Sequence, residues 1–478
     1  MEILHAMIGE GQLHPSQNQA LEVLEAGKSA LCVLPTGRGK SLIFQIFAAT
    51  IALRDKKTSL FVYPLRALIA DQAYHLSNTF GKFGLKSVVL CGQTPASERP
   101  KIMEGLQKGE YDIVLTTPEY LDIHSSEIAS AAEIGFVVVD ECHHIGEVKV
   151  GQRTAYGNMP RILSELKNPQ VLALSATVSS DVYAEIKKYL PVSELVKDNF
   201  ERSNLFIDDQ RNIKTKDDYL CALVGSGQKT VVYANSREQT IALARMLKSR
   251  CPHVAMQIGF YNAGMSKSQR KMIEEYFRDN KLSCLVATSA FGEGVNIADI
   301  RHVCLYHLPF SDVEFNQMSG RAGRDGAPAI VHLLFSRTDA SINTGILQMS
   351  CPTREVLADI YRWLRSGCNN NSGEFSFVNE NLMEMYNNSL APAMPGAVMC
   401  GVAIFEELGL IETKSTYVDG KTSTFVKIIP GTQVKLENSS RFVEGLAQIT
   451  DFETYRDFAL RATKDELTCI LRHPITPA

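Results

Sequence analysis

The sequence lacks the features that mark several classes of protein. Its 11 cysteines include no C-x-x-C pair, so neither a disulfide framework nor a zinc site is indicated. No apolar run approaches the ~18 residues that a membrane span needs, and the N-terminus lacks the basic and then apolar pattern of a signal peptide. We therefore expect a cytoplasmic protein in a reducing compartment, without a membrane partner.

Strong bias in charge or composition is also missing. The chain has 49 Lys and Arg against 53 Asp and Glu, and its formal net charge of −4 is the opposite of a basic nucleic-acid coat protein. The bulk charge thus points to no polyanionic partner. With 45% hydrophobic and 21% charged residues, a disordered or fibrous protein is excluded. The 478 residues suggest about three domains, at ~150 residues per domain.

Two stretches of the chain alternate short apolar runs with helical patterns. This alternation predicts the doubly wound α/β class, a parallel sheet covered by helices on both faces, once in residues 1–200 and again in 201–345. In such sheets, ligands bind beyond the carboxyl ends of the strands. The predicted strands are SALCVLP, TSLFVYP, KSVVLCG, DIVLTTP, FVVVD and VLALSAT in the first stretch, and KTVVYAN, HVAMQIGFY, KLSCLVAT, HVCLYHL and AIVHLLF in the second.

Residues 346–478 form an accessory, mostly helical region by their pattern. Helices are predicted in TREVLADIYRWLRSG, NENLMEMYNNS and GAVMCGVAIFEELGLI, followed by a hairpin that turns at Asp419-Gly420. A winged helix-turn-helix fits this order, and a small α+β packing module fits it nearly as well. The terminal RFVEGLAQITDFETYRDFALRATKDELTCILRHP predicts one or two amphipathic helices of undisclosed role.

The segment LCVLPTGRGKSLIFQI has the pattern of a phosphate-binding loop. Gly37 and Gly39 let the backbone bend, so that N–H groups and the following helix N-terminus converge on phosphate oxygens. Lys40 would contact the outer phosphates and Ser41 would bind Mg²⁺. The strict pattern fails at its first position, which is Leu34, and a glycine-rich turn with a solvated lysine is the alternative.

Two acidic residues follow the buried strand in FVVVDECHH. Asp140 can hold the Mg²⁺ shell, while Glu141 orients and deprotonates the water that attacks a γ-phosphate. A solvated acidic turn is the alternative for an isolated pair of this kind. His143 and His144 lack cysteine or acidic ligands at a suitable spacing, so we predict no metal site there.

The segment QMSGRAGRDG adds Gln317, Arg321 and Arg324. A three-residue spacing presents both guanidinium groups on the same face of a helical turn, and planar donors suit phosphate oxygens. On the second lobe, these arginines would stabilise charge on the leaving phosphates across a cleft, as an arginine finger does. A solvated basic turn is the alternative.

These motifs, taken in order, resemble the helicases of the second superfamily, and among them the RecQ family. The resemblance covers about residues 10–340. It implies that Gln17 contacts adenine. It also implies that Thr36 belongs to the nucleotide-binding loop with Gly37, Gly39, Lys40 and Ser41, and that Asp140 and Gln317 take part in binding the nucleotide. The segments that carry it are HPSQNQA, PTGRGKS, YPLRALIADQ, TTPEYL, DECH, SAT, VVYANSREQTIALARML, NAGMSKSQRKMIEEYF, ATSAFGEGVN with Gly292, Gly294 and Asn296, and QMSGRAGRDG.

The resemblance implies two RecA-like lobes that close on ATP and Mg²⁺, with single-stranded DNA running across both lobes in a 3′→5′ direction. Arg66, Thr117 and Thr288 would then lie near the DNA-facing edge and contact the strand's backbone. Ser175 and Thr177 would link the nucleotide state to the position of the lobes.

The chain departs from the family pattern in two places. RecQ proteins carry an aromatic-rich loop with tryptophan after the acidic motif, whereas IGEVKVGQRTAYGNMPRI has only Tyr156, and the single tryptophan is Trp363. The coupling of DNA binding to hydrolysis would be rewired, weaker, or carried by Arg153 and Tyr156. The four-cysteine zinc module is represented by Cys351 and Cys368 alone, so we predict no zinc, and no HRDC-type domain is visible.

The sequence therefore predicts an ATP-dependent DNA helicase or translocase in recombination or repair. Its expected partners are single-stranded and forked duplex DNA, while protein partners are undefined. An RNA helicase, or a remodelling module that does not separate strands, remains an alternative. The net charge of −4 is compatible with this function, because a helicase grips only a short strand in one groove.

Overall fold

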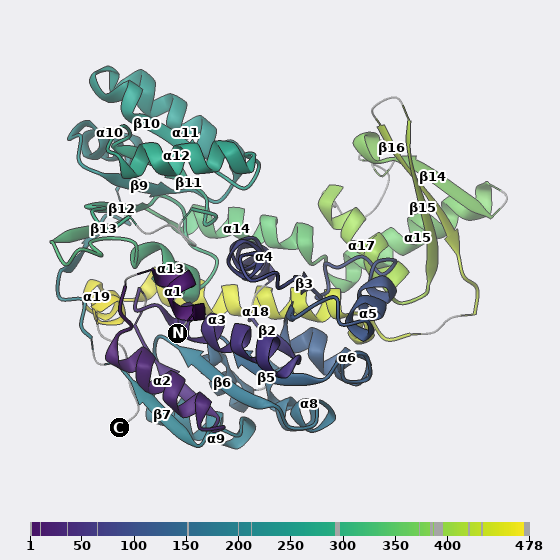
Figure 1. Ribbon diagram of the computed structural model, residues 1–478. Helices are drawn as coiled ribbons and strands as arrows, with labels where there is room; N and C mark the ends of the chain where they lie inside the picture. Colours follow the sequence, from purple (N-terminus) through teal and green to yellow (C-terminus); the bar gives the residue numbers. More distant parts are fainter. Residues whose placement is uncertain are drawn as a thin grey trace.

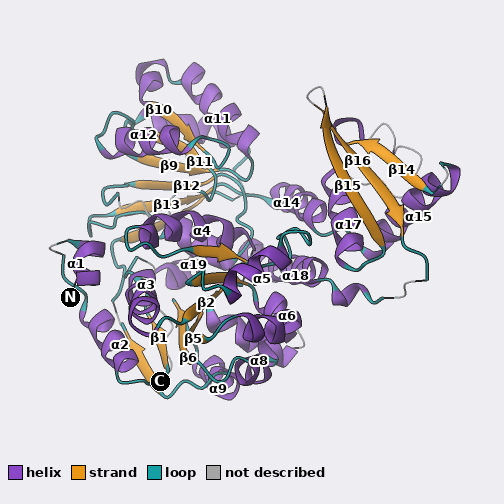
Figure 2. Cartoon of the chain, turned by 45° about the vertical axis from the view of Figure 1, so that its right-hand side comes forward, coloured by secondary structure: helices purple, strands orange, loops and turns teal. Residues whose placement is uncertain are grey.

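The computed structural model describes residues 2–472, except for residues 10, 36, 65, 151–152, 199, 212, 292–296, 372, 383–385, 387–394, 419–420 and 432–433. Two parallel sheets form two lobes, and a small antiparallel sheet with its helices lies to one side (Figures 1 and 2). The predicted fold class is thereby confirmed. The domain limits at residues 200 and 345 stay predictions.

The sheet of the first lobe has seven parallel strands in the order β3-β4-β2-β5-β6-β1-β7. Its bounds are β1 Ala30–Val33, β2 Thr58–Val62, β3 Ser87–Val89, β4 Ile113–Thr116, β5 Ile134–Val139, β6 Gln170–Ser175 and β7 Glu194–Lys197. Adjacent residues of β1 enter different cores, Ala30 and Cys32 on one face, Leu31 and Val33 on the other. A strand buried on both faces therefore reads as a continuous apolar run.

Helices cover both faces of this sheet. The first core packs against α2 (Pro15–Glu25), α3 (Lys40–Thr50) and α4 (Arg66–Gly81). The second packs against α5 (Arg99–Gln107), α6 (Pro118–Ala131), α8 (Met159–Glu165) and α9 (Ser180–Tyr189). The remaining short elements of the lobe are α1 Glu2–Ile8, the π-helix η1 Ile51–Asp55, the 3-10 helix η2 Cys142–Val150 and α7 Thr154–Gly157.

The second lobe repeats this arrangement with six parallel strands in the order β10-β11-β9-β12-β13-β8. Their bounds are β8 Leu205–Asp209, β9 Thr230–Tyr233, β10 Ile258–Tyr261, β11 Cys284–Ala287, β12 His302–Leu305 and β13 Ala329–Leu333. The helical elements of this lobe are α10 Lys216–Gly225, α11 Arg237–Arg250, the 3-10 helix η3 Pro252–Gln257, α12 Lys267–Arg278, α13 Asp312–Ser319 and α14 Arg337–Ser350. Buried residues form a core on each face of the sheet.

Three local predictions differ from the structure. The run HVAMQIGFY is a strand only from Ile258, because Pro252–Gln257 forms a 3-10 helix that begins at a proline and exposes Met256. The edge strands β7 and β8 were missed, since their sequences ELVK and LFIDD mix polar and apolar residues. Both strands are only partly buried, so they lack the continuous apolar signal.

The accessory region contains two of the three helices that its pattern predicts, and both strands of the predicted hairpin. β14 (Glu374–Val378), β16 (Lys421–Ile428) and β15 (Ile411–Val418) pair antiparallel in that order. They pack on α15 (Arg354–Asn370) and α17 (Pro395–Glu407). Trp363 is a core residue here, with its ring against Phe375, Phe377 and Tyr386. The turn at Asp419-Gly420 and most of NENLMEMYNNS lie outside the described residues, except for the 3-10 helix η4 Asn379–Asn381, Leu382 and Tyr386.

The end of the chain returns to the two lobes. After the short η5 (Leu436–Asn438), α18 (Ser440–Arg461) runs between the lobes beside α14, and α19 (Lys464–Arg472) follows it (Figure 1). The prediction of one or two helices at this end is thus confirmed, with two helices present. Apolar residues from the second half of α18 through α19 belong to a core of the second lobe, namely Phe452, Tyr455, Ala459, Ala462, Leu467 and Leu471.

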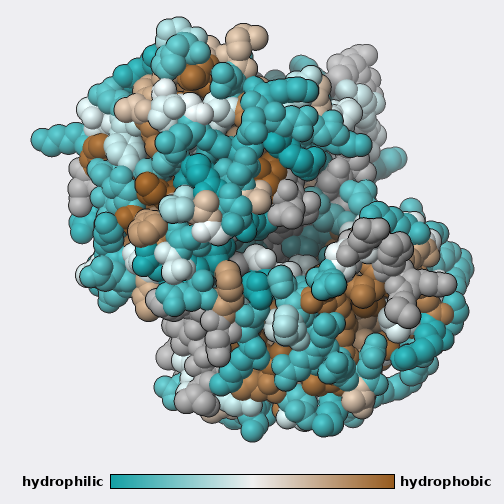
Figure 3. Space-filling model, turned by 60° about the vertical axis from the view of Figure 1, so that its left-hand side comes forward, coloured by the Kyte–Doolittle hydropathy of each residue, from teal (hydrophilic) through white to brown (hydrophobic). Residues whose placement is uncertain are grey.

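The surface is mostly hydrophilic on the face drawn in Figure 3, and it is hollowed between the second lobe above and the first lobe below. Within the described ranges, no helix has the length and apolar character that crossing a bilayer requires.

Replacing Leu467 by alanine tests whether α19 belongs to the core of the second lobe. Leu467 is 1% exposed, and a buried Leu→Ala change costs about 3 kcal/mol of the free energy of unfolding. We expect a loss of that size in denaturant unfolding. Leu446→Ala on α18, where the side chain is 42% exposed, is the control, and equal losses in both variants would contradict the packing of α19.

Candidate nucleotide-binding and nucleic-acid-binding sites

The predicted phosphate loop connects β1 to α3. Gly37 and Gly39 have φ of +83° and +70°, and Gly39 is the residue that caps α3. A Cβ at Gly39 would lie 2.4 Å from Nε2 of Gln17, so the position accepts no side chain. The helix begins at Lys40, directly after the loop, and its free N–H groups face the same space as Lys40 and Ser41.

Gln17 lies beneath this loop and holds it. Its amide nitrogen donates to the carbonyl oxygens of Arg38 (3.1 Å) and Gly39 (3.0 Å), and its Oε1 accepts from the backbone N–H of His14 (2.8 Å). The side chain is buried. Both amide hydrogens are therefore used by the loop, and a contact of Gln17 with adenine stays a prediction.

The two acidic residues lie at the end of β5. Nζ of Lys40 is 3.3 Å from Oε1 of Glu141, which has a φ of +46°. Burial disfavours the charged form of Glu141, but Lys40 and His143 outweigh burial and hold the pKa of Glu141 well below its usual range. Burial, followed by the charge of Glu141, raises the pKa of Asp140. The two carboxyl groups thus have unequal proton affinities, and Lys40 and His143 hold Glu141 in its ionised form. The separate roles predicted for Asp140 and Glu141 stay predictions.

His143 connects this site to the second lobe. Its Nδ1 lies 3.0 Å from Oγ of Ser175 and 3.4 Å from Oε2 of Glu141, and its Nε2 lies 3.4 Å from Oδ2 of Asp312 in α13. Burial lowers the pKa of His143, yet Asp312 and Glu141 raise it to about 10. A protonated His143 therefore stands between a carboxylate of each lobe.

Ser175 also donates to the carbonyl oxygen of Thr177 (2.8 Å). The SAT segment thereby contacts the acidic motif through His143. Its predicted role in linking nucleotide state to lobe position stays a prediction.

The arginines of the second lobe face the phosphate loop. α13 ends at Ser319, so Arg321 and Arg324 lie in the turns that follow and not on a helical turn, which corrects the predicted local structure. Gly320 caps the end of the helix, and Gly323, with a φ of +53°, lies in the turns that follow. A Cβ at Gly37 would lie 3.9 Å from Nε of Arg324, and burial together with Arg321 lowers the pKa of Arg324 to about 9.

A cavity of about 540 Å³ lies between these groups. It brings together most of the predicted nucleotide-site residues from both lobes. Gly37, Gly39, Lys40, Ser41, Asp140 and Glu141 line it from the first lobe, and Gln317, Arg321 and Arg324 line it from the second. Thr36 lies outside the described residues.

The chemistry of this lining fits a nucleoside triphosphate with Mg²⁺. A lysine, two arginines and a helix N-terminus supply positive charge for phosphates, and an aspartate with a serine hydroxyl supplies oxygen ligands for Mg²⁺. Glu141 stands beside them as the candidate base.

Three features in or near the cavity were missed by sequence reasoning. Arg202 lies at the lobe junction, donates to the carbonyl oxygens of Ala322 and Gly323, and would be 3.7 Å from a Cβ at Gly37. Asp312 binds His143 across the lobes. A face of α4 also lines the cavity, with Gln72, His75, Asn78 and Thr79. Of these residues only Gln72 lies in a recognised segment, YPLRALIADQ, so the tertiary structure reveals the others.

Thr117 and Thr288, two of the predicted nucleic-acid contacts, are not among the residues that line the nucleotide cavity. Thr117 precedes α6 and is 1% exposed, because α18 covers it. Thr288 follows β11 and lines a second cavity of about 260 Å³. Arg66 begins α4, but its side chain, like residues Gly292, Gly294 and Asn296, lies outside what the structure describes. Contact of these residues with nucleic acid stays a prediction.

The loop after the acidic motif centres on a buried arginine. Arg153, with φ of +48°, donates to Oε1 of Glu119 (2.8 Å) and to the carbonyl oxygen of Pro64 (2.6 Å), and lies 3.7 Å from Asp451 of α18. Tyr156 is a fully buried core residue. Arg153 thus joins the loop to YPLRALIADQ, to TTPEYL and to α18, which is the position a coupling residue needs.

The cysteines and the adjacent histidines are the remaining candidate metal ligands. Cys351 packs under Phe442 and Cys368 donates to the carbonyl oxygen of Val426, and all 11 cysteines are free thiols. The fold brings acidic groups to the adjacent histidines from distant segments, Asp312 to His143 and Asp451 to His144. Local spacing could not reveal these neighbours. The absence of zinc stays a prediction.

Comparison with protein families gives two matches. Residues 14–186 match the DEAD/DEAH box helicases, and residues 215–326 match the helicase conserved C-terminal domain. The matched segments contain the phosphate loop and acidic motif in the first lobe and the arginine segment in the second.

Among curated proteins, the chain is 30% identical over 369 residues to one from Bacillus subtilis named "Probable ATP-dependent DNA helicase RecS", covering 76% of this chain and 72% of that protein. It is 29% identical over 355 residues to the ATP-dependent DNA helicase RecQ of Bacillus subtilis, covering 73% of this chain. The chain spans 58% of that RecQ and 52% of the RecQ of Pasteurella multocida, so it covers little more than half the length of these relatives.

Among solved structures, the DUF1998 helicase MrfA bound to DNA and AMPPNP matches with a TM-score of 0.53 at 20% identity. The match covers 91% of this chain and 63% of that one. At this identity the likeness supports the fold alone.

Two substitutions test the roles in the nucleotide cavity. Lys40→Ala should abolish hydrolysis and weaken ATP binding, because it removes the cation that faces the phosphates. Glu141→Gln should keep binding and slow turnover by roughly 10²-fold or more, as loss of a general base does. ATP binding by fluorescent-analogue titration and phosphate release separate the two effects. Equal loss of ATP binding in both variants would refute the separate roles.

Arg324→Ala tests the contribution of the second lobe. Loss of an arginine that faces the phosphate loop should lower kcat by about 10³-fold and leave the melting temperature unchanged. Arg337→Ala, at an exposed position of α14, is the matched control and should keep wild-type turnover. A collapse of the melting temperature of Arg324→Ala would instead assign this residue to structure.

Proposed function

Because the chain belongs to the DEAD/DEAH box helicases, we propose that it is an ATP-dependent DNA helicase or translocase of the RecQ type. It moves 3′→5′ along a single strand and serves recombination or repair. The names of the relatives, RecS and RecQ, and the motifs in the order typical of RecQ proteins support this assignment.

One observation carries the proposal. The phosphate loop and the acidic pair of one lobe line the same cavity as Gln317, Arg321 and Arg324 of the other. A group bound there touches both lobes, so its presence or loss changes the free energy of their closure. This is the arrangement that a motor needs, and a simple hydrolase does not need two lobes.

The residues divide the work as follows. Lys40 binds the outer phosphates, and Ser41 and Asp140 hold Mg²⁺. Glu141 accepts the proton of the attacking water, while Arg321 and Arg324 stabilise the charge that develops on the phosphates. Bound ATP supplies the phosphoanhydride bond that is hydrolysed. His143 lies between Glu141 and Asp312, within 3.4 Å of both carboxylates. Movement of the second lobe would therefore change the charge environment of Glu141, the proposed base.

Stimulated hydrolysis and unwinding test the proposal together. ATPase rates are measured with single-stranded DNA and RNA of equal length, and unwinding is measured on forks with a 3′ tail, a 5′ tail or an RNA strand. We expect stimulation by DNA and unwinding of the 3′-tailed fork alone, and Lys40→Ala should be inactive in both assays.

The other outcomes identify the alternatives. A clear preference for RNA would refute the DNA assignment, and the mimivirus relative named "Putative ATP-dependent RNA helicase R290" makes this arm necessary. Brisk DNA-stimulated hydrolysis without unwinding would favour a remodelling module that does not separate strands.

A further inference from the structure

The C-terminal helix α18 covers the first lobe where the segment TTPEYL begins α6. Oε1 of Glu444 accepts hydrogen bonds from the backbone N–H of Gly92 and from the hydroxyl of Thr117, both at 2.7 Å. All three groups are buried. A carboxylate from the end of the chain is thus bound by two donors of the first lobe.

These two donors are suited to an anion. Thr117 caps α6, and its Oγ1 accepts from the backbone N–H of Tyr120 while its hydroxyl hydrogen points to Glu444. The helix N-terminus adds partial positive charge. A backbone N–H, a threonine hydroxyl and a helix N-terminus are common partners of nucleic-acid phosphates. The carboxylate of Glu444 has the charge and the acceptor atoms that a phosphate oxygen would bring.

Two further residues on the same face of α18 lie against groups that were predicted to serve nucleic acid. Gln448 lines the second cavity with Thr288 and Gln93, and Asp451 lies 3.7 Å from Arg153. Positions 444, 448 and 451 are spaced i, i+4 and i+7, so they share one face that is about 10 Å long. This face of α18 crosses from Thr117 toward the second lobe.

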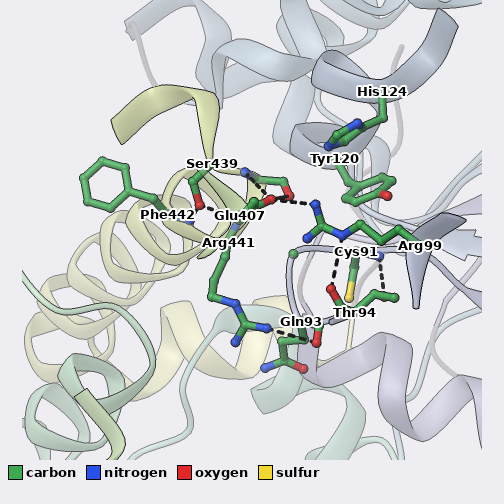
Figure 4. Close-up of polar contacts among 12 residues, drawn as sticks. Cys91, Gln93, Thr94, Arg99, Tyr120, His124, Glu407, Ser439, Arg441 and Phe442 are labelled. Carbon is green, nitrogen blue, oxygen red and sulfur yellow. Dashed lines mark hydrogen bonds and ion pairs between the residues drawn. The ribbon is translucent and has the colours of Figure 1, made fainter. Parts of the chain in front are cut away.

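The N-terminal end of α18 is fastened to the first lobe (Figure 4). Arg99 of α5 lies 2.8 Å from Glu407 at the end of α17, and Glu407 in turn accepts from Ser439 and Ser440 at the start of α18. Arg441 donates to the carbonyl oxygen of Gln93 (3.0 Å). A Cβ at Gly92 would lie 2.6 Å from Cα of Arg441, so the contact is close.

The other half of α18 belongs to the second lobe, where Phe452 and Tyr455 enter the core. The helix therefore bridges both lobes. Any relative movement of the lobes changes the distance between Glu444 and its two donors, because Phe452 moves with the second lobe and Thr117 with the first. Interfaces of this kind are bistable, so closure of the lobes can release the contact.

We propose that α18 is a built-in competitor of the nucleic-acid strand, with Glu444 in the place of a backbone phosphate on Gly92 and Thr117. A strand must displace this end of α18 to reach the first lobe, and until then the helix holds nucleic-acid binding and the ATPase that depends on it low. This inference rests on the proposed function, since it regulates the same nucleic-acid face.

Binding of a fluorescent 20-nucleotide oligothymidine, followed by anisotropy, tests the competition in the full chain. Glu444→Ala removes the carboxylate, and we expect at least about fivefold tighter binding, together with a higher ATPase rate at subsaturating oligonucleotide. Glu453→Ala removes the same charge from an exposed position of the same helix and serves as the matched control. It should bind the oligonucleotide as the wild type does, which separates the contact with Thr117 from a general loss of negative charge.

Hydrogen exchange in the wild-type protein tests displacement without a substitution. Amides near the start of α18 should exchange faster when the oligonucleotide is saturating, while those of α3 keep their protection. Equal or slower exchange there, with the oligonucleotide bound, would overturn the proposal even if Glu444→Ala failed to fold.

The two proposals fail in different ways. If the wild type binds the oligonucleotide and its ATPase is stimulated, but Glu444→Ala binds no more tightly than Glu453→Ala, the competition is refuted and the helicase assignment stands. If neither the wild type nor Glu444→Ala binds DNA or RNA oligonucleotides at any concentration tested, the proposed function itself is refuted.

Discussion

A row of alternating charges joins the two lobes, and the arrangement of the site depends on it. Lys40 pairs with Glu141, Glu141 with His143, and His143 with Asp312 of the second lobe. Every member is partly or fully buried, so each needs its neighbour to offset the cost of losing water. A change of charge at the phosphate loop should therefore alter the ion pair between His143 and Asp312 of α13. This helix carries Gln317 and precedes the arginine turns.

The helix α18 adds a second bridge between the lobes, beside the predicted nucleic-acid contacts Thr117 and Thr288. Arg153 connects the two bridges. Its loop follows the acidic motif in the sequence, and its guanidinium lies beside Glu119 of the first lobe and Asp451 of α18. Burial raises the pKa of Glu119 to about 7 even beside Arg153. Arg153 thus lies beside two carboxylates, Glu119 and Asp451. Under the proposed competition, a phosphate that reached Arg153 would compete with them. In this protein a buried ion cluster stands where RecQ relatives are expected to have an aromatic-rich loop.

The sequence predicted the parts of the structure that local pattern encodes. Continuous apolar strands, such as β1 in the first lobe and β9 in the second, allowed the two lobes to be predicted. Gly37 and Gly39 allowed the loop to be predicted, because its backbone needs a positive φ at both positions. The strands β7 and β8 escaped prediction because their short sequences mix polar and apolar residues. Arg202, Asp312 and Glu444 escaped because their partners lie far away in the chain, and only the packing of lobes and α18 brings them together.

The central claim is that a nucleotide joins the two lobes through the arginines. Energy transfer between dyes at Lys188→Cys in α9 and Lys248→Cys in α11 measures this directly, in a chain whose exposed Cys469 is replaced by serine. A non-hydrolysable ATP analogue with Mg²⁺ should raise the transfer efficiency, and Arg324→Ala should prevent the rise. An unchanged efficiency in the otherwise native chain, or an equal rise in the Arg324→Ala variant, would contradict it.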